Sequence, residues 1–483
     1  MHALASIPVL FLLAVPPSAL SGPAPQSSSA QAAPPASRAG AGAKPLSTAG
    51  LKPQPFKTED SKAGWKVRIP GGRALATPAV WGGKVFVGGG FGSHEFYAFD
   101  AATGKPRWAL SLSDDGPTAA VADGDRVAFN TESCTLFMVE AATGKPLWSR
   151  WLGDPLMSQP ALHGDLVLMA YPGRDGQHRL AALSAKDGKT RYERVIEGDI
   201  ISAPVVEGDS VYLATLDGTV HRTGLADGKA LWSKPMQATS APWVAGEQVH
   251  VAKREKAVER PGNPPQDDNE GFVAMSPRSG QFVGPMKAAK SAGYLNPAKQ
   301  AKSGYSAKQK SDDSSVGFGG GAPVSAKVDR ALANTGQGTV RGLWEYQGSR
   351  PLVVGDRLFA VQGDVVRAVA ADSDKVLWEH KLEGDTEKVG GHLATPPAYA
   401  SGKLVVGTVT GKVFGLDAAT GSELFRYDLK EEIRFQPALV KGVIYLGTTA
   451  GTLVAVDTGD LSLDGWTMWG GSPEHNGPRE APR

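Results

Sequence analysis

The chain has 483 residues, of which 41% are hydrophobic, so it is long and apolar enough to bury a sizeable core. Its net charge of +2 excludes the strongly basic balance that is typical of nucleic-acid-binding proteins. A single cysteine, Cys134, excludes an internal disulfide and a multi-cysteine metal site. Because Cys134 lies in the apolar run CTLFMV, we interpret it as a buried, inert thiol.

The N-terminal residues have the composition of an export signal. Residues 4–20 form a short apolar run that ends in small residues, and we interpret residues 1–21 as a secretory signal peptide. The run is too short and too rich in proline to predict a membrane span. No cysteine follows it, which excludes a lipid anchor at that position. The expected location is periplasmic or secreted.

Residues 22–62 are rich in Ala, Pro and Ser and contain almost no large apolar side chains. Such a composition cannot bury enough surface to offset the entropy of ordering, so it predicts a disordered linker. The apolar core is then expected to begin at Trp65. At the other end of the chain, residues 478–483 are interpreted as a short tail.

One motif recurs between these ends. It reads DAATGKPRW at 100–108 and EAATGKPLW at 140–148, and weaker copies begin at Ser184, Gly224 and Asp417. Glycine at positive φ, with Asp or Thr side chains that bond nearby N–H groups, indicates the turn of a β-hairpin. The aromatic residue that closes each copy supplies apolar surface at one fixed place.

Eight units can be counted from the prolines that open them. Successive prolines lie 38 to 46 residues apart, except for a gap of 109 residues after the fifth. These prolines are Pro78, Pro117, Pro160, Pro204, Pro242, Pro351, Pro397 and Pro437. Short strands at this repeat length predict an all-β, eight-bladed β-propeller of four-stranded antiparallel blades. Since Trp65 precedes Pro78 much as Trp148 precedes Pro160, residues 63–70 are predicted to form an N-terminal strand that closes the last blade.

The fifth unit departs from the pattern. It contains a polar loop at 253–270 and a Lys/Gly-rich insertion at about 285–340. This insertion is open to two interpretations: a solvated loop, or an arm that binds an anionic surface or an acidic partner. The candidate arm residues are Lys287, Lys290, Tyr294, Lys299, Lys302, Tyr305, Lys308 and Lys310.

The repeated Ala-x-Asp-x-x-Thr-Gly-x-x-x-Trp motif resembles the PQQ-like β-propeller family, over roughly residues 63–477. That family includes quinoprotein dehydrogenases and non-enzymatic outer-membrane assembly propellers. The resemblance implies that each motif aromatic packs between blades, against the turn of the adjacent motif. The residues implied in this docking are Trp65, Asp100, Gly104, Trp108, Gly144, Trp148, Gly188, Tyr192, Gly228, Trp232, Trp378, Asp417, Gly421 and Phe425.

Two further expectations follow from the resemblance. Most repeats have a small residue two positions before the Asp, so Met138 and Arg222 imply looser docking in two blades. The segment Trp466–Gly477 is similar to a signature at the ends of such chains, in which His475 is expected to be structural.

The sequence favours binding over catalysis. The histidines show no metal-ligand spacing, no nucleophile elbow is present, and the calcium ligands and catalytic base of a quinoprotein match no motif. We therefore predict no catalytic residue, no metal and no cofactor, in an exported, monomeric scaffold that binds envelope or extracellular proteins. The alternatives are an oxidoreductase that uses PQQ and Ca²⁺, and a polyanion or envelope-surface binder that uses the lysine-rich insertion.

Overall fold

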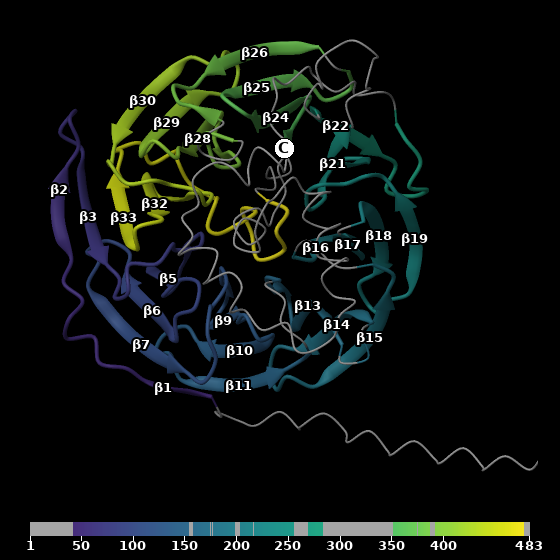
Figure 1. The fold of residues 1–483 in the computed structure, drawn as a ribbon, viewed down its shortest axis with the longest axis horizontal. Coiled ribbons are helices and arrows are strands. Elements are labelled where there is room, and N and C mark those ends of the chain that lie inside the picture. The colour runs from purple at the N-terminus through teal and green to yellow at the C-terminus, as the bar shows by residue number, and fades with distance from the viewer. Residues whose placement is uncertain are drawn as a thin grey trace, which may run out of the picture. The chain divides into compact units, whose positions relative to one another are not determined.

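The computed structural model describes most of the chain after residue 41. The described residues are 42–153, 158–173, 175, 177–198, 203–215, 217–255, 269–283, 351–373, 375–386 and 392–477. Within them the protein is all-β, and eight antiparallel sheets form a ring (Figure 1). The predicted eight-bladed β-propeller is confirmed. The described residues include no helix that is long and apolar enough to span a membrane.

Blades 1 to 4 each use four consecutive strands, ordered from the centre of the ring outward. Blade 1 consists of β4 (Ala79–Trp81), β5 (Lys84–Gly88), β6 (Glu95–Asp100) and β7 (Pro106–Leu112), and blade 2 of β8 (Val121–Asp123), β9 (Arg126–Phe129), β10 (Thr135–Glu140) and β11 (Pro146–Trp151). Blade 3 consists of β12 (Ala161–His163), β13 (Leu166–Pro172), β14 (His178–Ser184) and β15 (Thr190–Ile196), and blade 4 of β16 (Val205–Glu207), β17 (Ser210–Ala214), β18 (Thr219–Gly224) and β19 (Ala230–Pro235).

Blades 5 to 8 follow the same order. Blade 5 has three described strands, β20 (Trp243–Ala245), β21 (Gln248–Glu255) and β22 (Asn269–Met275), and blade 6 consists of β23 (Leu352–Val354), β24 (Arg357–Gln362), β25 (Val365–Ala370) and β26 (Val376–Lys381). Blade 7 consists of β27 (Ala398–Ala400), β28 (Lys403–Gly407), β29 (Lys412–Asp417) and β30 (Glu423–Asp428), and blade 8 contains β31 (Ala438–Val440), β32 (Val443–Gly447) and β33 (Thr452–Asp457).

Blade 8 takes its fourth strand from the other end of the chain. This strand, β3 (Ala63–Arg68), pairs with β33 in antiparallel register, with Trp65 opposite Ala455. The prediction that residues 63–70 close the last blade is therefore confirmed. The ladder between β3 and β33 joins the two ends of the chain. It therefore closes the ring and leaves β33 without an unpaired edge.

The prediction of a disordered linker is wrong for residues 42–62. Strand β1 (Ala43–Pro45) pairs with β7 of blade 1, and β2 (Gln54–Lys57) pairs with β3 of blade 8. Between them Leu51 is buried in the same core cluster as Trp65. We call residues 42–62 the N-terminal strap. Strand pairing to two preformed sheet edges overrides the weak local propensity of this Ala- and Pro-rich segment. The rest of the predicted linker, and the predicted signal peptide, lie outside the described residues.

The fifth blade is also ordered further into its predicted loop than expected. Strand β21 continues to Glu255 and β22 begins at Asn269, so the ends of the predicted 253–270 loop are strand. Residues 256–268 and the Lys/Gly-rich insertion lie outside the described residues.

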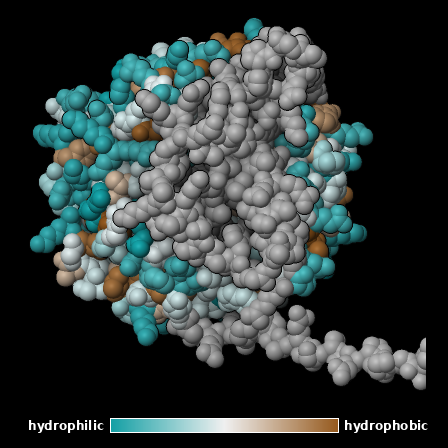
Figure 2. Space-filling model, viewed as in Figure 1, coloured by the Kyte–Doolittle hydropathy of each residue, from teal (hydrophilic) through white to brown (hydrophobic). Residues whose placement is uncertain are grey.

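One β-bulge recurs at the outer edge of the blades. The register between third and fourth strands shifts after Ala98, Met138, Ala182, Arg222, Ala368 and Gly415. A bulge leaves one residue of the fourth strand unpaired and turns its side chain outward. This explains why Leu231, Leu377 and Leu424 are 47%, 39% and 47% exposed. Elsewhere the described surface is mostly hydrophilic (Figure 2).

Candidate functional site

The motif aromatics join neighbouring blades by a repeated contact. The indole N–H of Trp108 donates to the carbonyl of Ala141 at 3.2 Å, and that of Trp148 to the carbonyl of Ala185 at 2.9 Å. Trp65, Trp232 and Trp378 donate in the same way to Ala101, Pro277 and Ala418. Each carbonyl belongs to the motif turn of the next blade.

Glycine is required where each indole ring lies on that turn. Gly144 has a φ of 74°, and a Cβ atom added to it would lie 2.6 Å from the Trp108 ring. Gly104, Gly188 and Gly421 meet the rings of Trp65, Trp148 and Trp378 in the same way, and Gly228 meets Tyr192. Such close approach and positive φ are available only to glycine. The Asp positions shape the turn, since Asp100 and Asp417 each accept hydrogen bonds from a threonine three residues later.

Two predicted docking residues behave differently from the tryptophans. Phe425 is half-buried, approaches Gly415 of its own blade and stacks on Tyr427, with ring centroids 4.9 Å apart. The Tyr192 hydroxyl is buried without a hydrogen-bond partner, and burial raises the pKa of Tyr192 to about 12. A phenol or phenyl ring has no indole N–H at the right place, so these two contacts lack the bond to the next turn.

The expectation of looser docking at two blades holds for only one. Trp148, opposite Met138, is 2% exposed, so the larger side chain there does not loosen the contact. Trp232, opposite Arg222, is only half-buried. Arg222 donates to the Pro277 carbonyl that Trp232 also uses, and the guanidinium therefore shares the turn with the indole.

The C-terminal residues 466–477 lie at the centre of the ring (Figure 1). They bond in turn to the innermost strands, which have no inner neighbour in their own sheets. Leu439 of blade 8, Val80 of blade 1, Leu162 of blade 3 and Val206 of blade 4 each donate a backbone N–H to a carbonyl of this tail. The tail side chains Trp466, Met468 and Trp469 are buried in three different core clusters. The chain thus fills its own central channel at this level.

His475 fixes the tail to blade 3. Its Nδ1 lies 3.0 Å from the carbonyl oxygen of Trp469, and its Nε2 lies 2.8 Å from that of Pro160. The side chain is fully enclosed, and burial lowers the pKa of His475. A neutral imidazole has one N–H and donates to one of these carbonyls, and the enclosed ring gives His475 a structural position, as the sequence led us to expect.

A buried carboxyl lies between blades 1 and 2, on the loops opposite the motif turns. Glu132 is 6% exposed, and its Oε1 accepts a hydrogen bond from the N–H of Gly92 at 2.6 Å. Burial, reinforced by Asp115 and Asp114, raises the pKa of Glu132 to about 7. The carboxyl can therefore hold a proton near neutral pH. Nothing in the sequence distinguished Glu132, because no motif surrounds it.

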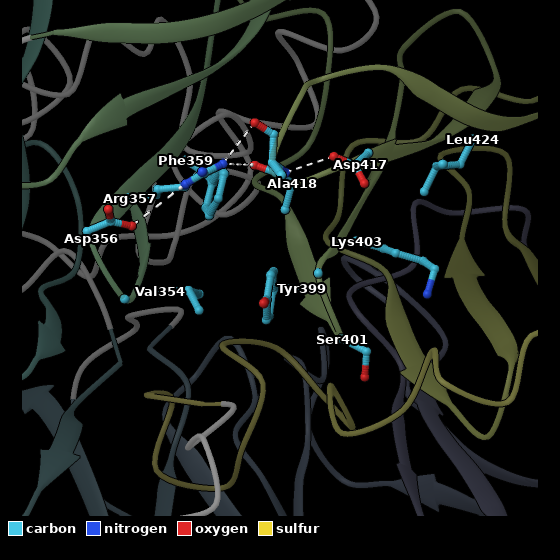
Figure 3. A pocket seen from close by; sticks show the side chains of 13 residues that line it. Val354, Asp356, Arg357, Phe359, Tyr399, Ser401, Lys403, Asp417, Ala418 and Leu424 are labelled. Carbon is cyan, nitrogen blue, oxygen red and sulfur yellow. Dashed lines mark hydrogen bonds and ion pairs between the residues drawn. The ribbon is translucent and has the colours of Figure 1, made fainter. Parts of the chain in front are cut away.

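A cavity of about 470 Å³ opens in the seam between blades 6 and 7. Its apolar lining includes Val354, Phe359, Tyr399 and the bulge residue Leu424, as Figure 3 shows. Tyr399 is half-buried, whereas the corresponding second residues of the other innermost strands, such as Val80 and Leu162, are buried. The cavity is open to solvent, is lined by both apolar and charged side chains, and has a volume within the range of about 300–1,000 Å³ that is usual for ligand sites. We call it the seam pocket.

The charged groups around the seam pocket are held by local partners. Arg357 donates through Nη1 to the carbonyls of Ala418 and Ala419 at 3.0 and 2.9 Å. Lys403 contacts Ser462 at 2.7 Å and Asp460 at 3.1 Å. Hydrogen bonds from Thr420 lower the pKa of Asp417. The pocket therefore has a fixed polar rim around an aromatic floor. Sequence reasoning missed it, because Val354 does not stand out among the small and polar residues that most blades have at this position.

The predicted interaction arm, Lys287 to Lys310, lies outside the described residues. It stays a prediction.

Comparison with known proteins places the fold in a family. A family model described as outer membrane protein assembly factor BamB matches residues 55–284 and 362–475, which is more than half of the chain. The chain belongs to the BamB family. No curated protein sequence matches this BamB-family propeller significantly.

Solved structures share its fold at low sequence identity. BamB from Moraxella catarrhalis is 14% identical with a TM-score of 0.53, and the match covers 81% of this chain and 96% of that one. The computationally designed Ika8 protein is 13% identical with a TM-score of 0.54, covering 81% and 98% of the two chains. Quinohemoprotein alcohol dehydrogenase ADHIIG from Pseudomonas putida HK5 is 12% identical with a TM-score of 0.51, covering 83% and 76%. At these identities the likeness concerns the fold alone.

The described residues show no carboxylate cluster at the centre of the ring for a PQQ–calcium pair. Among the described residues, no three His, Cys, Asp or Glu side chains converge where they could hold a metal ion. Trp466, Met468 and Trp469 occupy the centre of the ring at the level of the innermost strands. We assign no redox step to the described residues.

Proposed function

We propose that this BamB-family propeller is an exported scaffold that binds protein partners in the cell envelope and has no catalytic activity. The match of the BamB model to both halves of the ring carries the proposal. The filled centre supports it, because a channel occupied by the chain's own tail leaves the rims and seams as binding surfaces. The scaffold is expected to act as a monomer in the periplasm or outside the cell.

Crosslinking followed by mass spectrometry in the native cell envelope tests this proposal. We expect reproducible crosslinks between the propeller and one or a few envelope proteins. Crosslinks that occur only within the chain, or at random with abundant proteins, would contradict it. The exposed strap residue Lys57 serves as an internal reference position for the crosslinks.

The alternative of a PQQ- and Ca²⁺-dependent oxidoreductase is favoured only by the shared fold with quinohemoprotein alcohol dehydrogenase. It predicts a saturable absorbance change and dye-linked dehydrogenase activity when PQQ and Ca²⁺ are added to the purified protein. The scaffold proposal predicts neither.

A second alternative is binding to an anionic surface through the lysine-rich insertion, which has six lysines and no acid between Lys287 and Lys310. It predicts pull-down by anionic vesicles that weakens as salt rises and is lost when residues 285–310 are deleted. Pull-down that survives this deletion would remove the alternative.

A further inference from the structure

We propose that the seam pocket between blades 6 and 7 is a seat for a tryptophan side chain, or another aromatic side chain with an N–H or O–H donor, of a protein partner. The inference rests on the proposed scaffold function and specifies where and by what chemistry a partner is held.

The molecule itself contains an occupied version of this seat. Between blades 1 and 2, Trp81 crosses the seam and donates its indole N–H to the carbonyl of Gly124 at 3.0 Å. Trp81 is the third residue of β4, and Gly124 is the first turn residue after β8. An aromatic side chain thus bridges the innermost hairpins of two neighbouring blades.

The ladder register places Val354 and Ser401 at the corresponding positions between blades 6 and 7. Trp81 pairs with Lys84 across its hairpin, as Val354 pairs with Arg357. Ser401 follows β27 as Gly124 follows β8. Both Val354 and Ser401 line the seam pocket. Val354 stands at the position of the indole, so the chain places no aromatic ring at that point of this seam; among the eight innermost strands only β4 has a tryptophan there.

The walls of the pocket suit an aromatic occupant. The rings of Phe359 and Tyr399 lie 6.4 Å apart at 21°, and Tyr399 presents a half-exposed face beside Val354 (Figure 3). An incoming ring can stack on Tyr399, and the guanidinium of Arg357 stands at the same rim as a cation–π partner. Leu424, 47% exposed, extends the apolar surface toward solvent, where the partner's backbone would lie.

The polar groups around the pocket favour an occupant that donates a hydrogen bond over an occupant with a negative charge. Arg357 and Lys403 already contact carbonyl, hydroxyl and carboxylate oxygens of this chain. Asp417 likewise accepts hydrogen bonds from its own turn. In the occupied seam the acceptor is the backbone carbonyl of Gly124, and Ser401, at the matching position, lines the pocket. An indole or phenol donor completes this arrangement, whereas a carboxylate would meet a carbonyl oxygen.

Fluorine NMR with a fluorinated indole tests the seat on the full-length protein. We expect saturable line broadening with millimolar affinity, since small ligands gain at most about 1.5 kcal/mol per heavy atom and usually far less. Val354→Trp, which supplies the missing ring, should weaken binding by about tenfold or more. Leu461→Trp, at a residue 77% exposed and outside the pocket, is the matched control and should bind as the unmodified protein does.

A second variant covers the case in which Val354→Trp does not fold. Leu424→Ser removes apolar surface from the rim and should weaken binding about two- to fivefold. No saturable broadening in the unmodified protein, or equal binding in all folded variants, overturns the proposed seat.

Failure of the seat and failure of the scaffold function give different results. If envelope partners are captured equally by the unmodified protein and by Val354→Trp, the scaffold stands and the seat is wrong. If the indole binds and Val354→Trp abolishes its binding, but no envelope partner is crosslinked, the seat stands and the scaffold proposal fails.

Discussion

The seam between blades 8 and 1 and the seam between blades 6 and 7 use the same motif contact but differ in what surrounds it. In the closing seam, Ala101 accepts hydrogen bonds from both Trp65 and Tyr445, at 3.1 Å each. The N-terminal strap then pairs with the outer strands of both blades. In the seam between blades 6 and 7, Ala418 likewise accepts from two donors, Trp378 and Arg357, but no added strand among those described pairs with β26 or β30, and a cavity of about 470 Å³ lies inside it.

This difference separates stability from binding around one ring. The closing seam joins the two ends of the chain and must resist opening, so it carries additional strands and hydrogen bonds. The seam between blades 6 and 7 is continuous in the chain and can leave apolar surface open to solvent. Seams that share one motif can therefore serve different purposes according to the residues beside the motif.

Deletion of residues 63–70 should have the largest effect on the closing seam. It removes β3, which lies between β2 and β33, and exposes the edge of β33. We expect a loss of more than about 5 kcal/mol in the free energy of unfolding, enough to unfold many domains of this kind. Deletion of residues 42–57 removes only edge strands and should cost less. Thermal and chemical denaturation measure both, and an unchanged midpoint after removal of 63–70 would contradict closure by β3.

Substitution of one docking tryptophan in each seam compares the motif contact directly. Trp65→Ala and Trp378→Ala each remove a buried indole, 7% and 8% exposed, and should cost about 3–5 kcal/mol. Trp65→Ala should cost about 1 kcal/mol more, because Leu51, Tyr445 and the strap also lose a packing partner. Urea denaturation measures the difference. Equal or reversed losses would show that the strap adds nothing to the closing seam.

The buried carboxyl in the seam between blades 1 and 2 predicts a pH dependence. The folded-state pKa of Glu132, about 7, lies above the ordinary value of 4.5, so the fold favours the protonated form. Its stabilising contribution is complete below about pH 4.5 and is lost as the pH rises through 7. Glu132→Gln should therefore raise stability at about pH 8, on the order of 2 kcal/mol, and leave it unchanged at about pH 4.

Denaturation of both proteins at the two pH values measures this difference, and the other titrating groups cancel in the comparison. A Glu132→Gln variant that is less stable at the higher pH would mean that the ionised carboxylate is the form the seam requires.

The smallest effect concerns the innermost hairpin turns. Ser401 and Lys441 have φ values of 46° and 50°, in the region that favours glycine. Ser401→Gly, at the seam pocket, and Lys441→Gly, in blade 8, should each stabilise by about 0.5 kcal/mol, because relief of strain exceeds the entropy cost of glycine. Each of these two substitutions is the control for the other. A loss of stability for Ser401→Gly alone would indicate that its side chain supports the pocket.

The ring could be predicted from sequence because its information is local and repeated. Each motif copy carries its turn glycine and its aromatic, and Trp65 stands before Pro78 where a fourth strand is needed. The strap could not be predicted in this way. Its strands contain Pro45 and Pro55 and bury little of their own surface, so they exist only because the edges of β7 and β3 are already formed.

The candidate sites were harder to predict because each depends on which side chains the fold brings together in one seam. Glu132 acquires its high pKa from burial and from the nearby Asp115 and Asp114, which outweigh the hydrogen bond from Gly92, and only the fold brings these groups together. The seam pocket lies beside Val354, which has the position of Trp81 in blade 1. Alignment of the innermost strands of the repeats shows this difference, but the cavity depends on Tyr399 and Arg357 of the packed structure.

The most direct test of this account is site-specific photocrosslinking in the native envelope. A photoreactive residue at Leu424, beside the seam pocket, is compared with one at Lys57, on the strap of the closing seam. We predict partner adducts at Leu424 that disappear with Val354→Trp, and none at Lys57. Equal adducts at both positions, or adducts at Leu424 that persist with Val354→Trp, would contradict the assignment of binding to one seam and closure to the other.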